Sequence, residues 1–313
     1  MPRPLVRLPD HLGDRVLALP ALRALRAAHG PLWLEGRGDW GWLAAELPGC
    51  APLPQGARAP WALLLKPSFS AAWEARRHGA RIGAPGELRG PLLTTAVAPV
   101  DEHRVQAYLR LAWATGAPPA ERAPALRAAL PAPPVPSDGV PVGPGDLLVL
   151  LGSATGRTVD WPGLRAAADA IAAGGRRAVL VPPRDGAAAA VAQAGPHPVV
   201  QGAGGAPTVP EVAALARAAG AVLGVDSGLG HVAAAARRGA DLRIDAVVIV
   251  LGSTAAHRTA PPGARALRSP PPPCAPCGAK RCALRPAGTP PCLALDAGPV
   301  VAALRAALDR GAA

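Results

Sequence analysis

The sequence predicts a chain of two α/β domains, each built from parallel β-α-β units. Three observations lead to this fold class. The chain has 313 residues, which is long for one ordinary domain. Short apolar runs alternate with segments of helical periodicity, as in strands joined by crossover helices. The alternation stops in a proline-dense stretch, 117–145, and then restarts. We therefore place the domains at residues 1–143 and 144–313.

The elements of the first domain follow from apolar spacing and from the turn residues between the runs. Pro20 lies inside the first helical segment and should kink that helix or reset its start, because proline lacks a backbone N–H. The expected elements are a strand at 4–8, a loop at 10–13, a helix at 15–28, strands at 31–35 and 61–65 and a helix at 105–114.

The second domain repeats the same rhythm. Thr208 and Glu211 have the spacing of a capping box, which marks the start of a helix. The last helix of the chain is expected to pack back on the first domain. The remaining expectations are strands at 146–151, 178–181, 221–225 and 246–251, a loop at 152–162, and helices at 163–173, 185–194, 208–219 and 231–237.

The chain is basic, with 33 Lys and Arg against 21 Asp and Glu and a formal net charge of +12. Only Lys66 and Lys280 are lysines, and this bias toward arginine, alanine and proline is typical of a GC-rich genome. Arginine forks also suit phosphate and carboxylate partners, and a basic face favours an anionic membrane or nucleic acid. No nucleic-acid reader motif is present, so we expect no nucleic-acid partner.

No apolar run approaches the length of a transmembrane span or the core of a secretory signal. We therefore expect a cytoplasmic protein.

The segment 223–236 carries the sharpest chemical signal. A buried strand ends at Asp226, turns through Ser227 and Gly228, and enters a helix near His231. Free backbone N–H groups and the positive end of a helix make such a turn a seat for phosphate. Ser227 and His231 can donate further hydrogen bonds. The alternative is an ordinary strand–turn–helix connection that His231 merely caps.

Five motifs together resemble glycosyltransferase family 9, the ADP-heptose:lipopolysaccharide heptosyltransferases. The VDSGLGHVAAA segment and the Gly-Ser-Thr turn after the next strand are similar to the family's signature. The other matching segments are Leu12–Leu22, the run Lys66–Ala71 with Arg81–Gly83 and Arg89–Leu93, the helix Thr208–Ala219, and the cysteine segment that starts at Cys274. They occur in the family's order over nearly the whole chain.

The resemblance implies a GT-B fold, with two Rossmann-like domains facing each other across a cleft. It also implies inverting transfer of a heptose from an ADP-sugar to a lipid-linked oligosaccharide. Inversion needs a base for the acceptor hydroxyl, and Asp14 falls on the family's proposed catalytic aspartate. Independently, a carboxylate after a strand and glycine turn suits a ligand site, although a helix N-terminus uses aspartate equally well. Ser68 and Ser70 fall on the acceptor side.

Donor binding requires groups that neutralise a diphosphate. The candidates are Thr155, Arg157, Asp185 and the turn residues Asp226, Ser227, Gly228 and His231. The sequence departs from the family at two places. Val159 stands where a lysine is usual, and only Asp185 stands in for a glutamate that holds the ribose. A degenerate member that binds nucleotide-sugar or a partner protein without turnover is therefore the alternative.

Four cysteines near the C-terminus, Cys274, Cys277, Cys282 and Cys292, are spaced C-x2-C-x4-C-x9-C. Four thiolates at this spacing suit a structural zinc ion or an iron–sulfur cluster, and a disulfide is a further alternative. We favour free thiols, because the resemblance implies chemistry without a metal or other cofactor.

The expected partners are a nucleotide-sugar, a glycolipid or glycan acceptor and the anionic inner membrane surface. His103, Arg104 and Arg110 could meet acidic acceptor groups, but an ordinary solvated helix face is our preferred interpretation.

Overall fold

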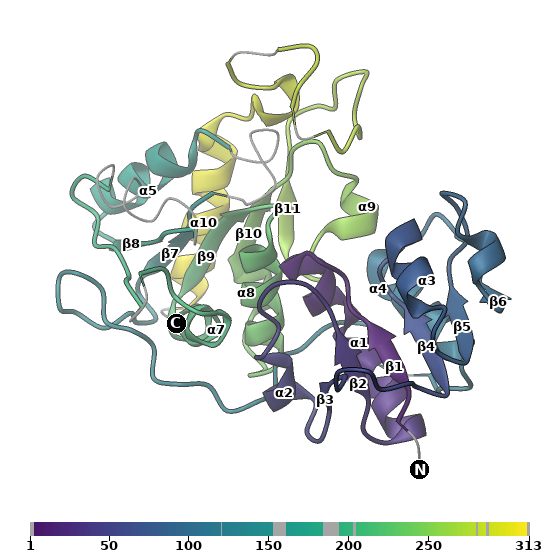
Figure 1. Cartoon of the computed structure of the whole chain (residues 1–313). Coiled ribbons are helices and arrows are strands. Elements are labelled where there is room, and N and C mark those ends of the chain that lie inside the picture. Colours follow the sequence, from purple (N-terminus) through teal and green to yellow (C-terminus); the bar gives the residue numbers. More distant parts are fainter. Residues whose placement is uncertain are drawn as a thin grey trace. The chain divides into compact units, whose positions relative to one another are not determined.

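A computed structural model describes residues 3–119, 121–152, 161–183, 194–202, 205–279, 281–285 and 288–311 (Figure 1). The chain divides into two compact units, Met1–Pro124 and Ala125–Ala313. This division lies before the predicted boundary at 143, because the proline-dense stretch is tied to the second unit. The backbone N–H of Leu126 donates to the carbonyl of Ala235 at 2.9 Å, and Arg177 pairs with Asp138 at 2.8 Å.

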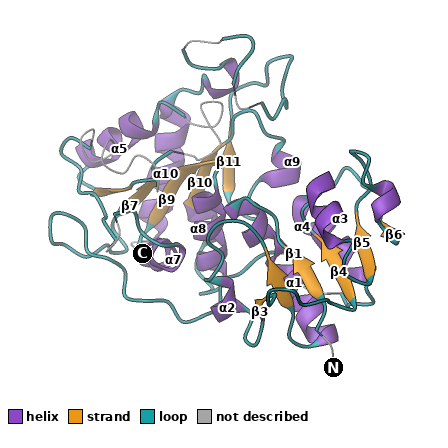
Figure 2. Cartoon of the chain, viewed as in Figure 1, coloured by secondary structure: helices purple, strands orange, loops and turns teal. Residues whose placement is uncertain are grey.

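The N-terminal unit contains a six-stranded parallel sheet with the order β3-β2-β1-β4-β5-β6 (Figure 2). Val6 at the centre of β1 pairs with Leu34 on one side and Leu63 on the other. This strand order is that of the Rossmann fold. The strands are β1 (Leu5–Arg7), β2 (Trp33–Glu35), β3 (Ala51–Pro52), β4 (Trp61–Leu64), β5 (Ala80–Gly83) and β6 (Thr95–Ala96).

Helices pack on the two faces of this sheet. Since side chains alternate along a strand, Leu5 and Leu64 share one face, where they pack against Ala72 and Ala75 of α3. The long helix α1 packs against α4. The helical elements are α1 (Leu12–His29), α2 (Leu43–Glu46), α3 (Phe69–Ala75), the 3-10 turn η1 (Gly90–Leu92) and α4 (Arg104–Trp113).

Helix α1 differs from its prediction. It begins at Leu12 rather than at residue 15, and it continues through Pro20 instead of restarting there. The leucines at 17, 19, 22 and 25 are fully buried. Their burial offsets the single backbone hydrogen bond that Pro20 cannot donate.

The C-terminal unit contains a five-stranded parallel sheet with the order β11-β10-β9-β7-β8. Strands β8 and β9 have the bounds that the sequence predicts. The capping box at Thr208 and Glu211 is present, with α7 directly after it. The strands are β7 (Leu147–Leu150), β8 (Ala178–Val181), β9 (Ala221–Val225), β10 (Val247–Val250) and β11 (Arg265–Leu267). The helix expected at 185–194 lies outside the described residues, apart from its last position.

Two pairs of helices cover this sheet. Val149, Leu223 and Val248 belong to one core with the apolar side chains of α5 and α10. The alternate strand residues face α8, where Gly230 is required: a Cβ there would lie 2.8 Å from Cδ1 of Ile249. The helical elements are α5 (Leu164–Ala173), α7 (Val209–Ala218), α8 (Gly228–Arg238), η2 (Ile244–Ala246), α9 (Ala256–Thr259), η3 (Pro291–Leu293) and α10 (Ala297–Gly311).

Helix α10 lies against α5, β9 and β10 of its own unit, and its predicted packing on the first domain stays a prediction. Among the described residues, the stretch Pro291–Gly311 is the one segment long and apolar enough to cross a membrane, with a mean hydropathy of 1.4. Its side chains Val300, Leu304 and Leu308 are fully buried in the protein core. The apolar character of this segment is therefore explained by its place in the core.

Candidate active site

Both sheets have a point where the strand order reverses. In the N-terminal unit it lies between β1 and β4, and in the C-terminal unit between β7 and β9. Ligands of open parallel sheets bind beyond the carboxyl ends of the strands at such a point. The segments that leave these ends carry Asp14 after β1, Ser68 after β4 and Asp226 after β9. Each unit therefore places sequence-predicted site residues where its topology favours a ligand.

Asp14 lies on the first turn of α1, and its side chain is 19% exposed. The Nη1 atom of Arg104, on α4, lies 3.3 Å from one carboxylate oxygen of Asp14 and 3.4 Å from the other. The sequence favoured an ordinary solvated helix face for Arg104. The structure differs, because Arg104 pairs with Asp14. A guanidinium that contacts both oxygens holds the carboxylate in one orientation.

Tyr108 lies one turn further along α4 and is buried. Burial, reinforced by the negative charge of Asp14, raises the pKa of Tyr108. The phenol therefore stays neutral at physiological pH and does not compete with Asp14 for Arg104 as an anion. The carboxylate of Asp14 therefore has a neutral phenol and a cation beside it.

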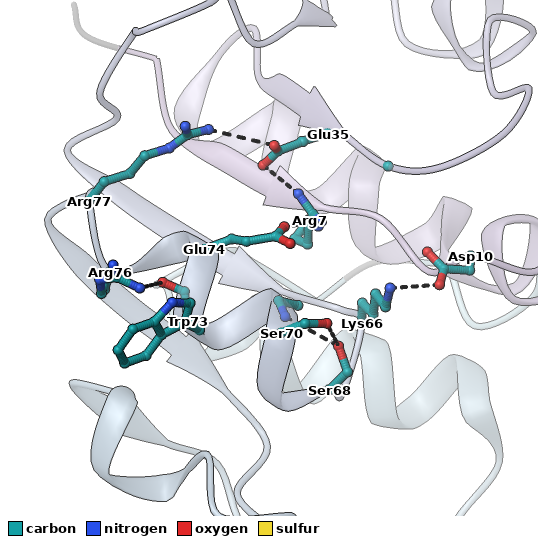
Figure 3. A network of polar contacts seen from close by, with 12 residues as sticks. Arg7, Asp10, Glu35, Lys66, Ser68, Ser70, Trp73, Glu74, Arg76 and Arg77 are labelled. Carbon is teal, nitrogen blue, oxygen red and sulfur yellow. Dashed lines mark hydrogen bonds and ion pairs between the residues drawn. The ribbon is translucent and has the colours of Figure 1, made fainter.

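Ser68 and Ser70 mark the beginning of α3, close to the carboxyl end of β4 (Figure 3). The Ser68 hydroxyl accepts a hydrogen bond from the Ala71 N–H at 3.3 Å and lies 3.2 Å from the Ser70 hydroxyl. In the preceding loop, the Lys66 ammonium pairs with Asp10 at 2.6 Å. These hydroxyls and charges suit a polar ligand such as a sugar. Sequence reasoning did not single out the pair of Lys66 and Asp10.

Asp226 directly follows β9, and its carboxylate is almost fully buried, the side chain being 6% exposed. Thr254 and Thr259 donate hydroxyl hydrogen bonds to its Oδ2 atom, the latter at 3.4 Å, and the His231 Nε2 atom lies 3.7 Å from Oδ1. Burial alone raises the pKa of Asp226, but the bonds from His231, Thr254 and Thr259 outweigh it and hold the pKa below its ordinary value. Asp226 is thus a fixed anion that orients the histidine.

Two polar atoms at the start of α8 are buried without a hydrogen-bond partner among the described residues. They are the Ser227 hydroxyl and Nδ1 of His231. Ser227 is the N-cap residue of α8, yet its side chain does not cap the helix. Gly228 and Leu229 are partly exposed, whereas His231 is buried, so part of the turn is open to solvent. Buried polar groups are rarely left unpaired, and these two stand beside free helical N–H groups that attract anions.

Three predicted donor residues, Thr155, Arg157 and Asp185, lie outside the described residues, as does Val159. The structure therefore places the turn from Asp226 to His231 but not the rest of the predicted donor site. It adds Thr254, which the family resemblance marked only as part of the Gly-Ser-Thr turn, and Thr259, which sequence reasoning did not single out.

The four clustered cysteines line one pocket together with apolar residues, including Leu284 and Pro291. All four are free thiols; Cys274 and Cys277 are exposed, and Cys292 is buried. No three His, Cys, Asp or Glu side chains in the described part of the chain are placed to hold one metal ion. The pocket therefore shows gathered thiols without the arrangement of a metal centre.

Parallel α/β units of this topology, with polar groups at the switch points, are the architecture of GT-B glycosyltransferases. The profile of glycosyltransferase family 9 (heptosyltransferase) matches residues 57–287. The chain therefore belongs to that family, as the sequence motifs indicated.

Solved structures of the same fold include three informative ones. ADP-heptose lps heptosyltransferase II of E. coli is 19% identical, with a TM-score of 0.72 and coverage of 99% of this chain and 100% of that one. E. coli WaaC with ADP-2-deoxy-2-fluoro heptose is 19% identical, with a TM-score of 0.61 and coverage of 86% and 93%. The dodecameric, iron-containing heptosyltransferase TibC, in complex with ADP-D-beta-D-heptose, is 16% identical, with a TM-score of 0.58 and coverage of 99% and 76%. No curated protein matches the sequence.

Proposed function

We propose that this chain is an inverting glycosyltransferase that moves a heptose from ADP-heptose to a lipopolysaccharide-type or other glycan acceptor. The observation that carries the proposal is the pair of unpartnered buried groups, the Ser227 hydroxyl and Nδ1 of His231, at the positive end of α8. Family membership supports sugar transfer, and ADP-heptose is the ligand named for the similar enzyme TibC. A diphosphate supplies oxygens that accept hydrogen bonds from the Ser227 hydroxyl and from the N–H groups at the start of α8.

In this proposal Asp14 is the general base. It accepts the proton of an acceptor hydroxyl as that oxygen attacks the anomeric carbon from the face opposite the diphosphate. The new glycosidic bond forms while the bond from the anomeric carbon to the diphosphate oxygen breaks, so the configuration inverts. The N–H groups of α8, Ser227 and His231 stabilise the charge that develops on the leaving diphosphate. Arg104 holds the Asp14 carboxylate in one orientation.

Thr155 and Arg157 are proposed to contact the diphosphate and Asp185 the ribose, as the family resemblance implies. Val159 in place of the usual lysine favours the alternative, a member that binds nucleotide-sugar or a partner protein without turnover. Release of ADP during incubation with donor and acceptor separates the two functions. Donor binding without release would support the alternative.

Ser227→Ala gives the sharpest test of the donor site. Because the hydroxyl has no hydrogen-bond partner among the described residues, we expect the free variant to melt at or above the wild-type temperature. Its Kd for ADP-heptose should rise about 5- to 10-fold, the equivalent of one lost hydrogen bond. Thermal shift and calorimetry with ADP-, UDP-, GDP- and dTDP-sugars measure both.

Thr208→Ala is the matched control for Ser227→Ala, since Thr208 caps α7 and should affect stability but not donor affinity. Equal donor affinity of wild type and Ser227→Ala would contradict the proposed site.

We also propose that transfer needs no metal ion, because the charges of the diphosphate are met by protein groups. Wild-type protein should keep its rate, within about twofold, after dialysis against EDTA. Mass spectrometry for bound metals on the same sample provides the control, since it shows whether the cysteine pocket carried an ion that the chelator removed. A rate that falls with EDTA and returns with one divalent metal would overturn this proposal.

The protein is proposed to act in the cytoplasm, bound peripherally to the anionic inner membrane surface and not to nucleic acid. The net charge of +12 supports the attraction to anionic lipid.

A further inference from the structure

Helix α3 carries an exposed aromatic pair. Phe69 is 45% exposed and Trp73 is 48% exposed. They stand four residues apart, and their rings stack with centroids 6.1 Å apart. Phe69 is the one phenylalanine of the chain. Large aromatic side chains that remain in water lose the free energy of burial, so such an exposed pair indicates a contact surface.

The orientation of this face is fixed by the rest of α3. Ala71, Ala72 and Ala75 are buried on the opposite side of the helix. Glu74 forms an ion pair with the buried Arg7 of β1, which ties the helix to the sheet (Figure 3). The aromatic pair therefore does not turn inward without breaking this anchor.

A cation accompanies the aromatic pair. The guanidinium of Arg76 lies over the Trp73 ring, 3.6 Å from its centroid (Figure 3). It donates a hydrogen bond to the Trp73 carbonyl at 3.2 Å, and it pairs with no carboxylate among the described residues. Because Arg76 covers one face of the indole, that face does not stack on a sugar ring. An indole with a guanidinium beside it is instead suited to the headgroup level of a bilayer.

A further exposed apolar side chain, Leu88, lies in a loop that starts from the same edge of the sheet as α3. Strands β4 and β5 are parallel neighbours, so α3 and the loop after β5 start from one edge. In that loop Leu88 is 86% exposed and has a positive φ of 60°. A non-glycine residue in this backbone region is strained, and such strain is found at functional surfaces.

We propose that Phe69, Trp73 and Arg76, together with Leu88 in the loop after the neighbouring strand, form the docking surface for an anionic lipid bilayer. The aromatic rings and the leucine enter the headgroup boundary, and Arg76 pairs with lipid phosphate. This inference rests on the proposed use of a membrane-borne acceptor. Ser68 and Ser70, at the start of the same helix, would then face the membrane-borne substrate.

The test is co-sedimentation of the full chain with vesicles of phosphatidylcholine containing phosphatidylglycerol. Phe69→Ser/Trp73→Ser should lower the partition coefficient about 10-fold or more, because two aromatic side chains no longer leave water. Arg76→Gln should weaken binding to these vesicles but not to pure phosphatidylcholine. The matched control is Val135→Ser/Val140→Ser, which removes two side chains that are each 52% exposed in the C-terminal unit.

Equal partitioning of wild type and the aromatic double variant would overturn the proposal. So would equal losses in the double variant and the valine control, or binding that requires an added glycan rather than anionic lipid. The donor thermal shift of the double variant is expected to equal that of wild type. A lost donor shift with retained vesicle binding would instead count against the proposed function and not against this surface.

Discussion

Asp14→Asn should lower kcat for transfer by about 10²- to 10⁴-fold, the range in which a positioned general base contributes. The amide keeps the shape of the carboxylate and still accepts a hydrogen bond from Arg104, but it cannot take the acceptor proton. We therefore expect KM for the donor to change little. Coupled detection of ADP release, with and without acceptor, measures the effect.

Asp10→Asn is the matched control for this experiment. Asp10 lies four residues before Asp14 in the same connection and carries the same group, but it pairs with Lys66. Its substitution should cost less than about tenfold in kcat, because it does not handle the transferred proton. Comparable losses in both variants would show that the loop as a whole, and not one carboxylate, is required. A full rate for Asp14→Asn would remove the proposed base.

The parallel strands were the most predictable part of the fold. Strand β8 lies between a Gly-Gly-Arg-Arg turn and a proline, and β9 lies between Gly220 and Asp226. A fully buried strand reads as a short continuous apolar run with clear ends. The predicted bounds of β8 and β9 therefore agree with the bounds in the structure.

Helix starts were less predictable. Helices α1 and α8 each begin three residues before the expected position, at Leu12 and Gly228. Glycine has low helix propensity, yet the first turns of both helices contain glycine. Packing overrides it, since Gly230 allows α8 to approach Ile249. The short helix α3 has too few residues to show a helical period, and no sequence signal predicted it.

The candidate site was predictable one unit at a time. The turn from Asp226 to His231 is contiguous in sequence, so one motif was enough to predict all of its residues. Arg104 is 90 residues from Asp14, and Thr259 is 33 residues from Asp226. These contacts depend on which strands and helices become neighbours, and helical spacing alone suggested a solvated face for Arg104. Long-range partners of this kind follow from topology, which the local pattern does not contain.

Asp226→Asn should destabilise the C-terminal unit by about 2–3 kcal/mol at neutral pH. The buried carboxylate accepts hydroxyl bonds from Thr254 and Thr259 and faces His231. An uncharged amide no longer matches the two hydroxyls and the imidazole that surround the carboxylate. Breaking buried pairs of this kind lowers the free energy of unfolding. Urea unfolding followed by tryptophan fluorescence measures the difference, with Asp245→Asn as the control. Asp245 also pairs with arginine, but its side chain is 55% exposed, so its effect should be small.

The pH dependence of this difference tests the charge itself. The pKa of Asp226 is held below its ordinary value, so ionisation stabilises the folded state. That stability is fully present above the pKa of the unfolded chain, about 3.9 for aspartate, and is lost as pH falls through the lower folded value. The gap between wild type and Asp226→Asn should therefore be constant from pH 7 to about 5 and shrink below about pH 4. A gap that is equally large at pH 3.5 would mean that hydrogen-bond geometry, and not the anion, holds His231 in place.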